Sequence, residues 1–164
     1  MKHLRDNRGF TIVELLLIMG ITSILIGLIT MNLVKVQRNT SVSASVDSFI
    51  ADLKGQQVKA MNGALATSNG YYGVYLQSNT NNYVLFHGSV YSASDSTNAP
   101  VAMDSSISIT TTFLNNSVVF LPVSGEVTYT GTQNTITLSN KNGSENAKIT
   151  FNKYGVVTNV QYAY

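Results

Sequence analysis

The sequence predicts an α+β fold in which a long N-terminal helix, transmembrane in its first half and amphipathic in its second, packs on an antiparallel β-sheet domain. Three observations predict it. An apolar run without charge follows the first residues, a run with helical periodicity comes next, and short strand-like runs fill the rest of the 164 residues. A chain of this length fits one modest domain with an appendage.

The apolar run begins close to the N-terminus. No charged residue lies between Leu15 and Val34, and Lys35 ends the run. Because about 20 apolar residues span a bilayer as a helix, residues 10–34 are long enough to cross a membrane once. Glu14 places a carboxylate inside this segment, at a cost of about 2.5–3.5 kcal/mol on insertion scales, so we expect it to have a partner.

Beyond Lys35 the pattern becomes that of an amphipathic helix. Apolar residues recur at spacings of three, four and seven or eight, which is the period of one helical face. They are Val42, Val46, Phe49, Ile50, Leu53, Met61 and Leu65. No proline interrupts the run, and residues 67–70 have the composition of a turn. The sequence therefore predicts one helix over residues 10–66.

Short β runs follow from residue 70 onward. We expect strands at residues 72–76, 83–86, 107–113, 117–121, 127–130, 135–138, 147–151 and 156–162. Residues 77–82 and the Asn142-Gly143 pair predict hairpin loops, and Ser92 to Pro100 has the composition of a surface loop. Residues 67–164 are therefore predicted to form the antiparallel β domain, which is large enough for its own core.

The N-terminal motif is specific. Residues 2–14 read KHLRDNRGFTIVE, in which a short basic segment ends at Gly9, Phe10 follows, and Glu14 lies at the start of the apolar run. This stretch resembles the leader and cleavage site of type IV prepilins and type II secretion pseudopilins. The resemblance implies that residues 1–9 are a leader peptide and that prepilin peptidase cuts between Gly9 and Phe10. It also implies that Phe10 becomes an N-methylphenylalanine and that Glu14 serves in assembly.

The β half carries a second resemblance. Residues 118–122 with Gly125, the runs 136–138 and 148–151, and then Gly155 are similar to the C-terminal pattern of pseudopilin H and FimT-like minor pilins. That pattern is a strand with phenylalanine and glycine, a hairpin, and a closing strand that begins with glycine.

These resemblances imply a structural subunit of a type IV pilus-like filament rather than an enzyme. The implied partners are prepilin peptidase, the pilus assembly platform protein with its ATPase, and other pilin subunits. The implied location is the cytoplasmic (inner) membrane, crossed once with the C-terminus outside, and afterwards a pilus at the cell surface or a periplasmic pseudopilus. Two alternatives remain open: a minor pseudopilin of a type II secretion system, and a tip minor pilin for DNA uptake or adhesion.

Two simpler N-terminal signals also contain an apolar run. An ordinary signal anchor has no need of Gly9 or Glu14. A secretory signal has an apolar core of about 7–15 residues, and the run here is longer. Its candidate cleavage site at residues 42–44 is also separated from the apolar run by Lys35 and Arg38. The prepilin interpretation explains more of the sequence.

Charge and composition limit the chemistry of the β domain. Residues 67–164 carry three lysines and four acids, which gives no strong nucleic-acid signal. The chain has 0 cysteines, so it forms neither a disulfide nor a thiolate metal site. We expect no cofactor, no metal and no catalytic group.

Three features of this domain leave alternatives open. Asp95 and Asp104 lack the spacing of a calcium loop, although calcium in the loop that carries them stays an alternative. His87 follows a predicted strand and is expected to be solvated. The 9 tyrosines of the chain are expected to pack in the sheet, with stacking on a carbohydrate or a nucleobase as the alternative.

Overall fold

The computed structural model describes residues 10–63, 70–128, 131, 134–143 and 145–163, without the side chains of residues 31, 32 and 34–39. The chain divides into two compact units, Met1–Gln37 and Arg38–Tyr164. Each unit is described by itself. The predicted leader and the predicted turn at residues 67–69 lie outside the described residues.

One long helix begins in the first unit and ends in the second. Helix α1 spans Ile12–Asn62, which is 51 residues, with Glu14 in its first turn and Lys59 in its last. Charges of these signs at these ends suit the helix macrodipole. The predicted helix ended at residue 66, and the described helix ends four residues earlier. The absence of proline between residues 12 and 62 explains why no break occurs.

Eight strands follow in the second unit. They are β1 (Tyr72–Leu76), β2 (Asn82–His87), β3 (Ala99–Ala102), β4 (Ile107–Thr111), β5 (Ser117–Phe120), β6 (Thr135–Asn140), β7 (Asn146–Phe151) and β8 (Val157–Ala163). A short 3₁₀ helix, η2 (Leu114–Asn116), precedes β5.

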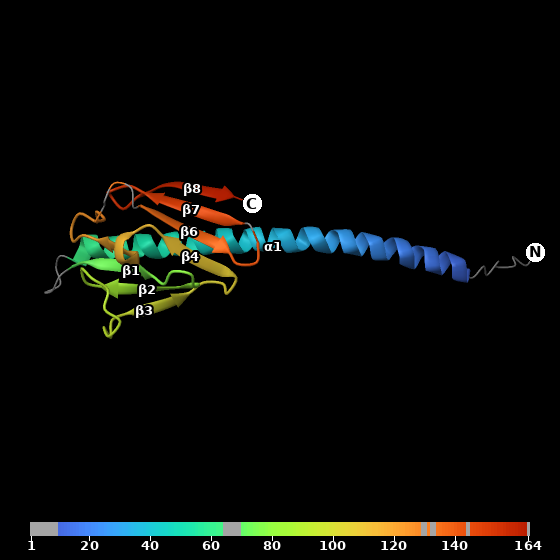
Figure 1. Ribbon diagram of the computed structural model, residues 1–164, viewed down its shortest axis with the longest axis horizontal. Coiled ribbons are helices and arrows are strands. Elements are labelled where there is room, and N and C mark those ends of the chain that lie inside the picture. Colours follow the sequence, from blue (N-terminus) through green and yellow to red (C-terminus); the bar gives the residue numbers. More distant parts are fainter. Residues whose placement is uncertain (1–9, 64–69, 129–130, 132–133, 144, 164) are drawn as a thin grey trace, which may run out of the picture. The chain divides into compact units, whose positions relative to one another are not determined.

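The strands form two antiparallel sheets of four strands each. The first has the order β3-β2-β1-β5 and the second the order β4-β6-β7-β8. In the view of Figure 1, β7 and β8 lie above the part of α1 that belongs to the second unit, β2 and β3 lie below it, and β4 and β6 overlap it. This confirms the predicted α+β class, with a helix packed on antiparallel β structure. The division into two sheets was not indicated by the sequence.

Two details of the predicted strands were wrong. Residues 99–102 form strand β3, so Ala99 and Pro100, which the sequence predicted as the end of a loop, pair with Leu85 and Val84 of β2 instead. Tertiary pairing of this kind overrides a local turn composition. In the predicted strand 127–130, Val127 forms only an isolated bridge with Phe120, and residues 129–130 lie outside the described residues.

The core of the second unit confirms most of the predicted helix face. Val42, Val46, Phe49 and Leu53 are all at most 2% exposed and lie in one cluster with residues of both sheets. Met61 was predicted on this face, yet it is 47% exposed. It lies near the end of the helix, beside the loop that contains Gly125.

Gln57 connects α1 to two loops of the β domain by hydrogen bonds. Its side-chain Nε2 donates hydrogen bonds to the Gly125 carbonyl at 2.9 Å and to the Tyr154 carbonyl at 2.8 Å. Gly155 has φ +72, and a Cβ there would lie 2.8 Å from the same Nε2 atom. Only glycine fits this conformation and this space without strain.

Candidate functional site

The candidate site is the N-terminal end of α1. Phe10 is the first residue that the structure describes, and its side chain is 79% exposed. Gly9 and the rest of the predicted leader lie outside the described residues, so the cleavage site stays a prediction.

Glu14 and Thr11 form a reciprocal cap at the start of the helix. The Glu14 backbone N–H donates to Thr11 Oγ1 at 3.2 Å, and the Thr11 backbone N–H donates to Glu14 Oε2 at 3.5 Å. The Leu15 backbone N–H also donates to the Thr11 carbonyl, at 3.1 Å. This is a capping box, in which residues three apart satisfy each other's backbone N–H groups. The threonine and the glutamate together therefore fix where the helix begins.

The cap leaves most hydrogen-bond acceptor sites of the Glu14 carboxylate unoccupied. One oxygen accepts one long hydrogen bond, and a carboxylate offers about four lone-pair sites. No ion pair joins Glu14 to a cation among the described residues. The charge is exposed at the end of an apolar segment, where it can accept a cationic partner from another molecule.

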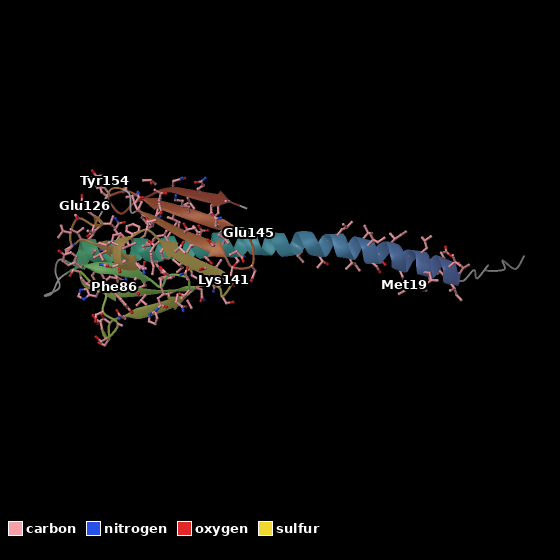
Figure 2. The ribbon with its side chains drawn as sticks, in the orientation of Figure 1. Met19, Phe86, Glu126, Lys141, Glu145 and Tyr154 are labelled. Atoms are coloured by element: carbon pink, nitrogen blue, oxygen red, sulfur yellow. The ribbon has the colours of Figure 1, made fainter. Side chains whose placement is uncertain are left out.

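The segment behind Glu14 is apolar and uncovered. Residues Ile12–Thr30 are long and apolar enough to cross a membrane, and none of this span is buried within the chain. Figure 2 shows its side chains, Met19 among them, pointing away from the helix on several sides. By length and composition alone, a signal sequence near an N-terminus meets the same criterion.

The hydroxyl groups in this segment are satisfied within the helix. Thr22 Oγ1 donates to the Ile18 carbonyl at 2.8 Å and Ser23 Oγ donates to the Met19 carbonyl at 2.7 Å. Thr30 Oγ1 donates in the same way, to a carbonyl four residues earlier. No unmet polar group on these side chains therefore opposes burial in lipid or against another helix.

The two candidate acids of the β domain serve local turns. Asp95 Oδ1 accepts from the backbone N–H and the hydroxyl of Thr97, at 2.8 and 2.7 Å. Asp104 Oδ1 accepts in the same way from Ser106, at 2.8 and 2.6 Å. These hydrogen bonds lower the pKa of both carboxyl groups below the usual range. Among the residues that the structure describes, no cluster of three or more His, Asp or Glu side chains lies where a metal could bind.

His87 lies at the end of β2, as expected. Its ring centroid is 4.8 Å from that of Tyr72, and the two rings are tilted by 49°. The structure brings no nucleophile into hydrogen-bonding contact with His87 among the described residues.

Tyr83 and Tyr91 have different environments. Tyr83 is fully buried, lies edge-on to Phe49 with ring centroids 5.1 Å apart, and donates a 2.5 Å hydrogen bond to Asp52 Oδ2. Tyr91 is half-buried and stacks on Tyr75, with centroids 4.0 Å apart. Tyr91 also lines an open hollow of about 150 Å³ that has uncharged walls. Packing therefore accounts for Tyr83, whereas Tyr91 offers an accessible ring.

One residue of the site was missed in the sequence. Thr11 holds the Glu14 backbone, and the pattern of Thr followed three residues later by Glu, just before an apolar run, is a recognised sign of a helix start. This signal was present in the motif at residues 9–14 and could have found it.

The comparisons agree with this N-terminal geometry. A family model described as the prokaryotic N-terminal methylation motif matches residues 4–30. No curated protein and no solved structure matches the chain. The matched span covers residues 4–9 of the basic segment, the capping box and most of the exposed apolar helix. The chain therefore carries a prepilin-type N-terminal methylation motif, and this motif, its apolar helix and its antiparallel β domain are consistent with the type IV pilin and pseudopilin superfamily.

Proposed function

We propose that the chain is a structural subunit of a type IV pilus-like filament. It is made with a leader, anchored in the membrane by residues 10–34, cleaved after Gly9, methylated on Phe10 and polymerised through its N-terminal helix. The observation that carries this proposal is the uncovered apolar helix with a single carboxylate near its start, inside a methylation motif. In this proposal residues 10–66 form the filament helix and residues 67–164 form the outer domain.

The proposed partners act in sequence. Prepilin peptidase removes residues 1–9, and an assembly platform with a cytoplasmic ATPase adds the subunit to others of its kind. In the filament, the ammonium of a neighbouring Phe10 meets Glu14 where the dielectric constant is low. Opposite charges attract far more strongly there than in water. A subunit that slipped along the axis would leave Glu14 unpaired, so the pair fixes the register.

The experiment that tests the proposal is mass spectrometry of the protein from the membrane fraction and from sheared filaments. We expect a chain that begins with N-methylated Phe10. An intact leader, or a terminus near residue 45 as a secretory signal would give, contradicts the proposal.

A minor pseudopilin of type II secretion is the second candidate. The C-terminal pattern similar to pseudopilin H falls on β5, β6, β7 and the glycine before β8, which supports this candidate. The expected location is then a periplasmic pseudopilus. Abundance in sheared filaments separates the two candidates, because a pseudopilin stays in the cell envelope.

A tip subunit for DNA uptake or adhesion receives less support. Lys141, Lys148 and Lys153 are the lysines of residues 67–164; the first donates to the Ser105 carbonyl at 2.9 Å and the last lies over the Tyr154 ring. We expect DNA binding no tighter than the non-specific range of about 10⁻⁴–10⁻⁶ M at physiological salt. Tighter binding with a steep salt dependence would favour DNA uptake instead.

A further inference from the structure

The face of the first sheet that is turned away from the core carries a second, smaller aromatic cluster. In β1, Val74 and Leu76 belong to the core, and side chains alternate along a strand, so Gly73 and Tyr75 lie on the opposite face. Residues that pair directly across two strands share a face. Phe86 of β2, which pairs with Gly73 and is labelled in Figure 2, therefore lies on this outer face as well.

Tyr91, in the segment after β2, packs on this outer face. Its ring stacks on the Tyr75 ring, with centroids 4.0 Å apart and planes 4° apart, and meets the Phe86 ring edge-on at 5.6 Å. Phe86 is only 2% exposed, although it is not part of the core cluster. Gly73 makes room for the Phe86 ring, because a Cβ there would lie 2.6 Å from Phe86 Cζ. The Tyr91 ring is therefore held in place by packing.

The hollow of about 150 Å³ that Tyr91 lines lies at this outer face. Val90 and Leu114 also line it and are 75% and 65% exposed. Three exposed polar residues complete the set that matters here, namely Ser89, Asn115 and Thr128. None of the described residues that line the hollow is charged. A drug-sized ligand needs a pocket of about 300–1,000 Å³, so this hollow suits a single ring.

The polar side chains at the hollow are not engaged elsewhere. The hydroxyl groups of Ser89 and Thr128 and the amide group of Asn115 form no hydrogen bond with another described residue. Asn115 has φ +54, a left-handed conformation that asparagine adopts more readily than most residues. The Ser117 hydroxyl donates to the Asn115 carbonyl at 3.1 Å, which engages the backbone of Asn115 and not its amide group. Hydrogen-bond donors and acceptors therefore lie beside a fixed aromatic ring.

These groups match the chemistry of a neutral sugar. A pyranose ring has a face of C–H groups that packs on an aromatic ring, and hydroxyl groups at its edge that both donate and accept. The hydroxyl groups of Ser and Thr and the amide group of Asn also donate and accept. A charged ligand would lose hydration without gaining an opposite charge from the walls. A purely apolar ligand would remove water from the polar side chains without replacing its hydrogen bonds.

A nucleobase is a weaker match than a sugar. Its ring could stack on Tyr91, but the rest of a nucleic acid carries phosphate groups, and its binding depends on cations that neutralise them. None of the three lysines of residues 67–164 lines the hollow. The uncharged walls therefore favour the sugar.

We propose that this hollow binds one neutral sugar residue of a glycan, with the sugar ring packed against Tyr91 and its hydroxyl groups hydrogen-bonded to Ser89, Asn115 and Thr128. A ligand of about a dozen heavy atoms in an open hollow has a Kd of about 1–10 mM. In the filament of the proposed function, many copies of the hollow would raise the apparent affinity for one glycan. The hollow itself does not depend on the filament.

The test uses the full chain in phosphocholine micelles, because maltoside and glucoside detergents carry sugar headgroups that would compete. Saturation-transfer NMR is recorded with the methyl glycosides of glucose, galactose, mannose and N-acetylglucosamine, each titrated through the millimolar range. We expect at least one of them to bind. Methyl glucuronide, which adds a carboxylate, and thymidine, which offers a nucleobase, should bind more weakly than that glycoside.

Substitutions of tyrosine locate the site. Tyr91→Ala should weaken binding at least about tenfold, because it removes both the stacking and the apolar area of the ring. Tyr91→Phe keeps the ring and should retain most of the binding. The control is Tyr154→Ala, which truncates an exposed tyrosine that does not line the hollow and should leave binding unchanged.

Two neighbouring asparagines give a matched pair of variants. Asn115 and Asn116 both have left-handed backbones, with φ +54 and +52, and only Asn115 lines the hollow. Glycine adopts this conformation readily, so each substitution removes an amide group and keeps the backbone. We expect Asn115→Gly to weaken binding about fivefold, as the loss of one hydrogen bond does, and Asn116→Gly to leave it unchanged.

Three results would overturn the proposal. Absence of saturation transfer to every neutral glycoside would show that the hollow does not bind a sugar. Unchanged binding by both Tyr91→Ala and Asn115→Gly would place the sugar elsewhere on the chain. Tighter binding of thymidine than of every glycoside would assign the hollow to a nucleobase. None of these results involves processing of the N-terminus, so mass spectrometry tests the proposed function separately.

Discussion

The two parts of helix α1 share one secondary structure and differ in what covers them. In residues 12–30 every side chain is exposed, whereas in the second unit one face of the helix, from Val42 to Leu53, is almost fully buried by the sheets. Burying a large apolar side chain contributes about 1.5–3 kcal/mol. The second part obtains this stabilisation from its own chain, whereas residues 12–30 obtain none of it from the rest of the described chain.

Under the proposed function, this difference means that folding and assembly depend on different parts of the chain. Helix propensity alone gives marginal stability in water, and most helical stability in proteins comes from packing. The second unit contains the packing that it needs. Changes in the second part of α1 should therefore alter the stability of the domain, and changes in the first part should alter membrane insertion and assembly.

The largest expected effect on stability is at Phe49. Phe49 is fully buried against Tyr83, and replacing a buried Phe with Ala typically costs about 3–5 kcal/mol. We expect Phe49→Ala to lower the free energy of unfolding of the β domain by that amount, measured by denaturant titration of the full chain in detergent. The matched control is Leu25→Ala, which truncates an exposed residue in the first part of the helix. A similar loss for both variants would contradict the comparison.

The next largest effect on stability is expected in the two loops that accept hydrogen bonds from Gln57. In Gly155→Ala the new Cβ would lie 2.8 Å from Gln57 Nε2 and 2.9 Å from the Gly125 carbonyl oxygen, in a backbone with φ +72. We expect a loss of at least about 2 kcal/mol, from the left-handed conformation and the overpacking together. Gly131→Ala is the control, because Gly131 has a similar positive φ of +58 and no described atom lies within 4 Å of the position that its Cβ would take. Equal losses would show that the contact with α1 contributes nothing.

A smaller effect is expected at the hydrogen bond between Tyr83 and Asp52. Tyr83→Phe removes this 2.5 Å bond and keeps the ring, so we expect a loss of about 1.5 kcal/mol, which is typical of a hydrogen bond to a charged group. Tyr75→Phe, at a half-buried ring without such a bond to a carboxylate, is the control.

The same pair of residues predicts a pH dependence. Burial, followed by the hydrogen bond to Asp52 and its charge, raises the pKa of Tyr83 well above its usual range. Unfolded chains lose this proton near pH 10, at the ordinary tyrosine pKa, while the folded domain keeps it. The stabilisation is therefore fully present below pH 10 and is lost as the pH rises through the folded pKa. Tyr83→Phe should make the alkaline decline in stability less steep, and an unchanged decline would contradict this assignment.

The smallest effect is expected at Asp104. Hydrogen bonds from the Ser106 hydroxyl and backbone N–H lower the pKa of this exposed carboxyl group. Its contribution is present above the unfolded pKa and disappears as the pH falls through the folded pKa. Asp104→Ala should lower the melting temperature less than Tyr83→Phe does, and its effect should vanish in acid. An effect that persists at low pH would mean that the side chain acts through packing.

The sequence predicted the features that depend on local pattern. The uncharged run before Lys35, the buried periodicity at Val42, Val46, Phe49 and Leu53, and most strands follow from the order of residues along a short stretch. The pairing of distant segments does not follow from local order. Strand β3 depends on a partner in β2, and the division into two sheets depends on which strands meet across the core.

For the candidate site, the sequence predicted Glu14 but missed its partner in the same turn. The carboxylate was conspicuous because it interrupts an apolar run. Thr11 was not conspicuous, because threonine is common at the start of a helix. The structure adds the capping role of Glu14 in its own helix, which has to be separated from the proposed pairing with another subunit.

The central claim is that the Glu14 charge pairs with a neighbouring subunit, and two variants test it most directly. Glu14→Gln keeps a capping-box residue at this position and removes the charge, whereas Thr11→Ala removes the threonine half of the cap and keeps the charge. The measurement is the amount of each variant in sheared filaments, relative to the cleaved amount in the membrane. We predict that both variants are inserted and cleaved, that Glu14→Gln is lost from filaments, and that Thr11→Ala is retained. Incorporation of Glu14→Gln at the wild-type level, with loss of Thr11→Ala, would contradict the claim and would leave Glu14 with only the capping role.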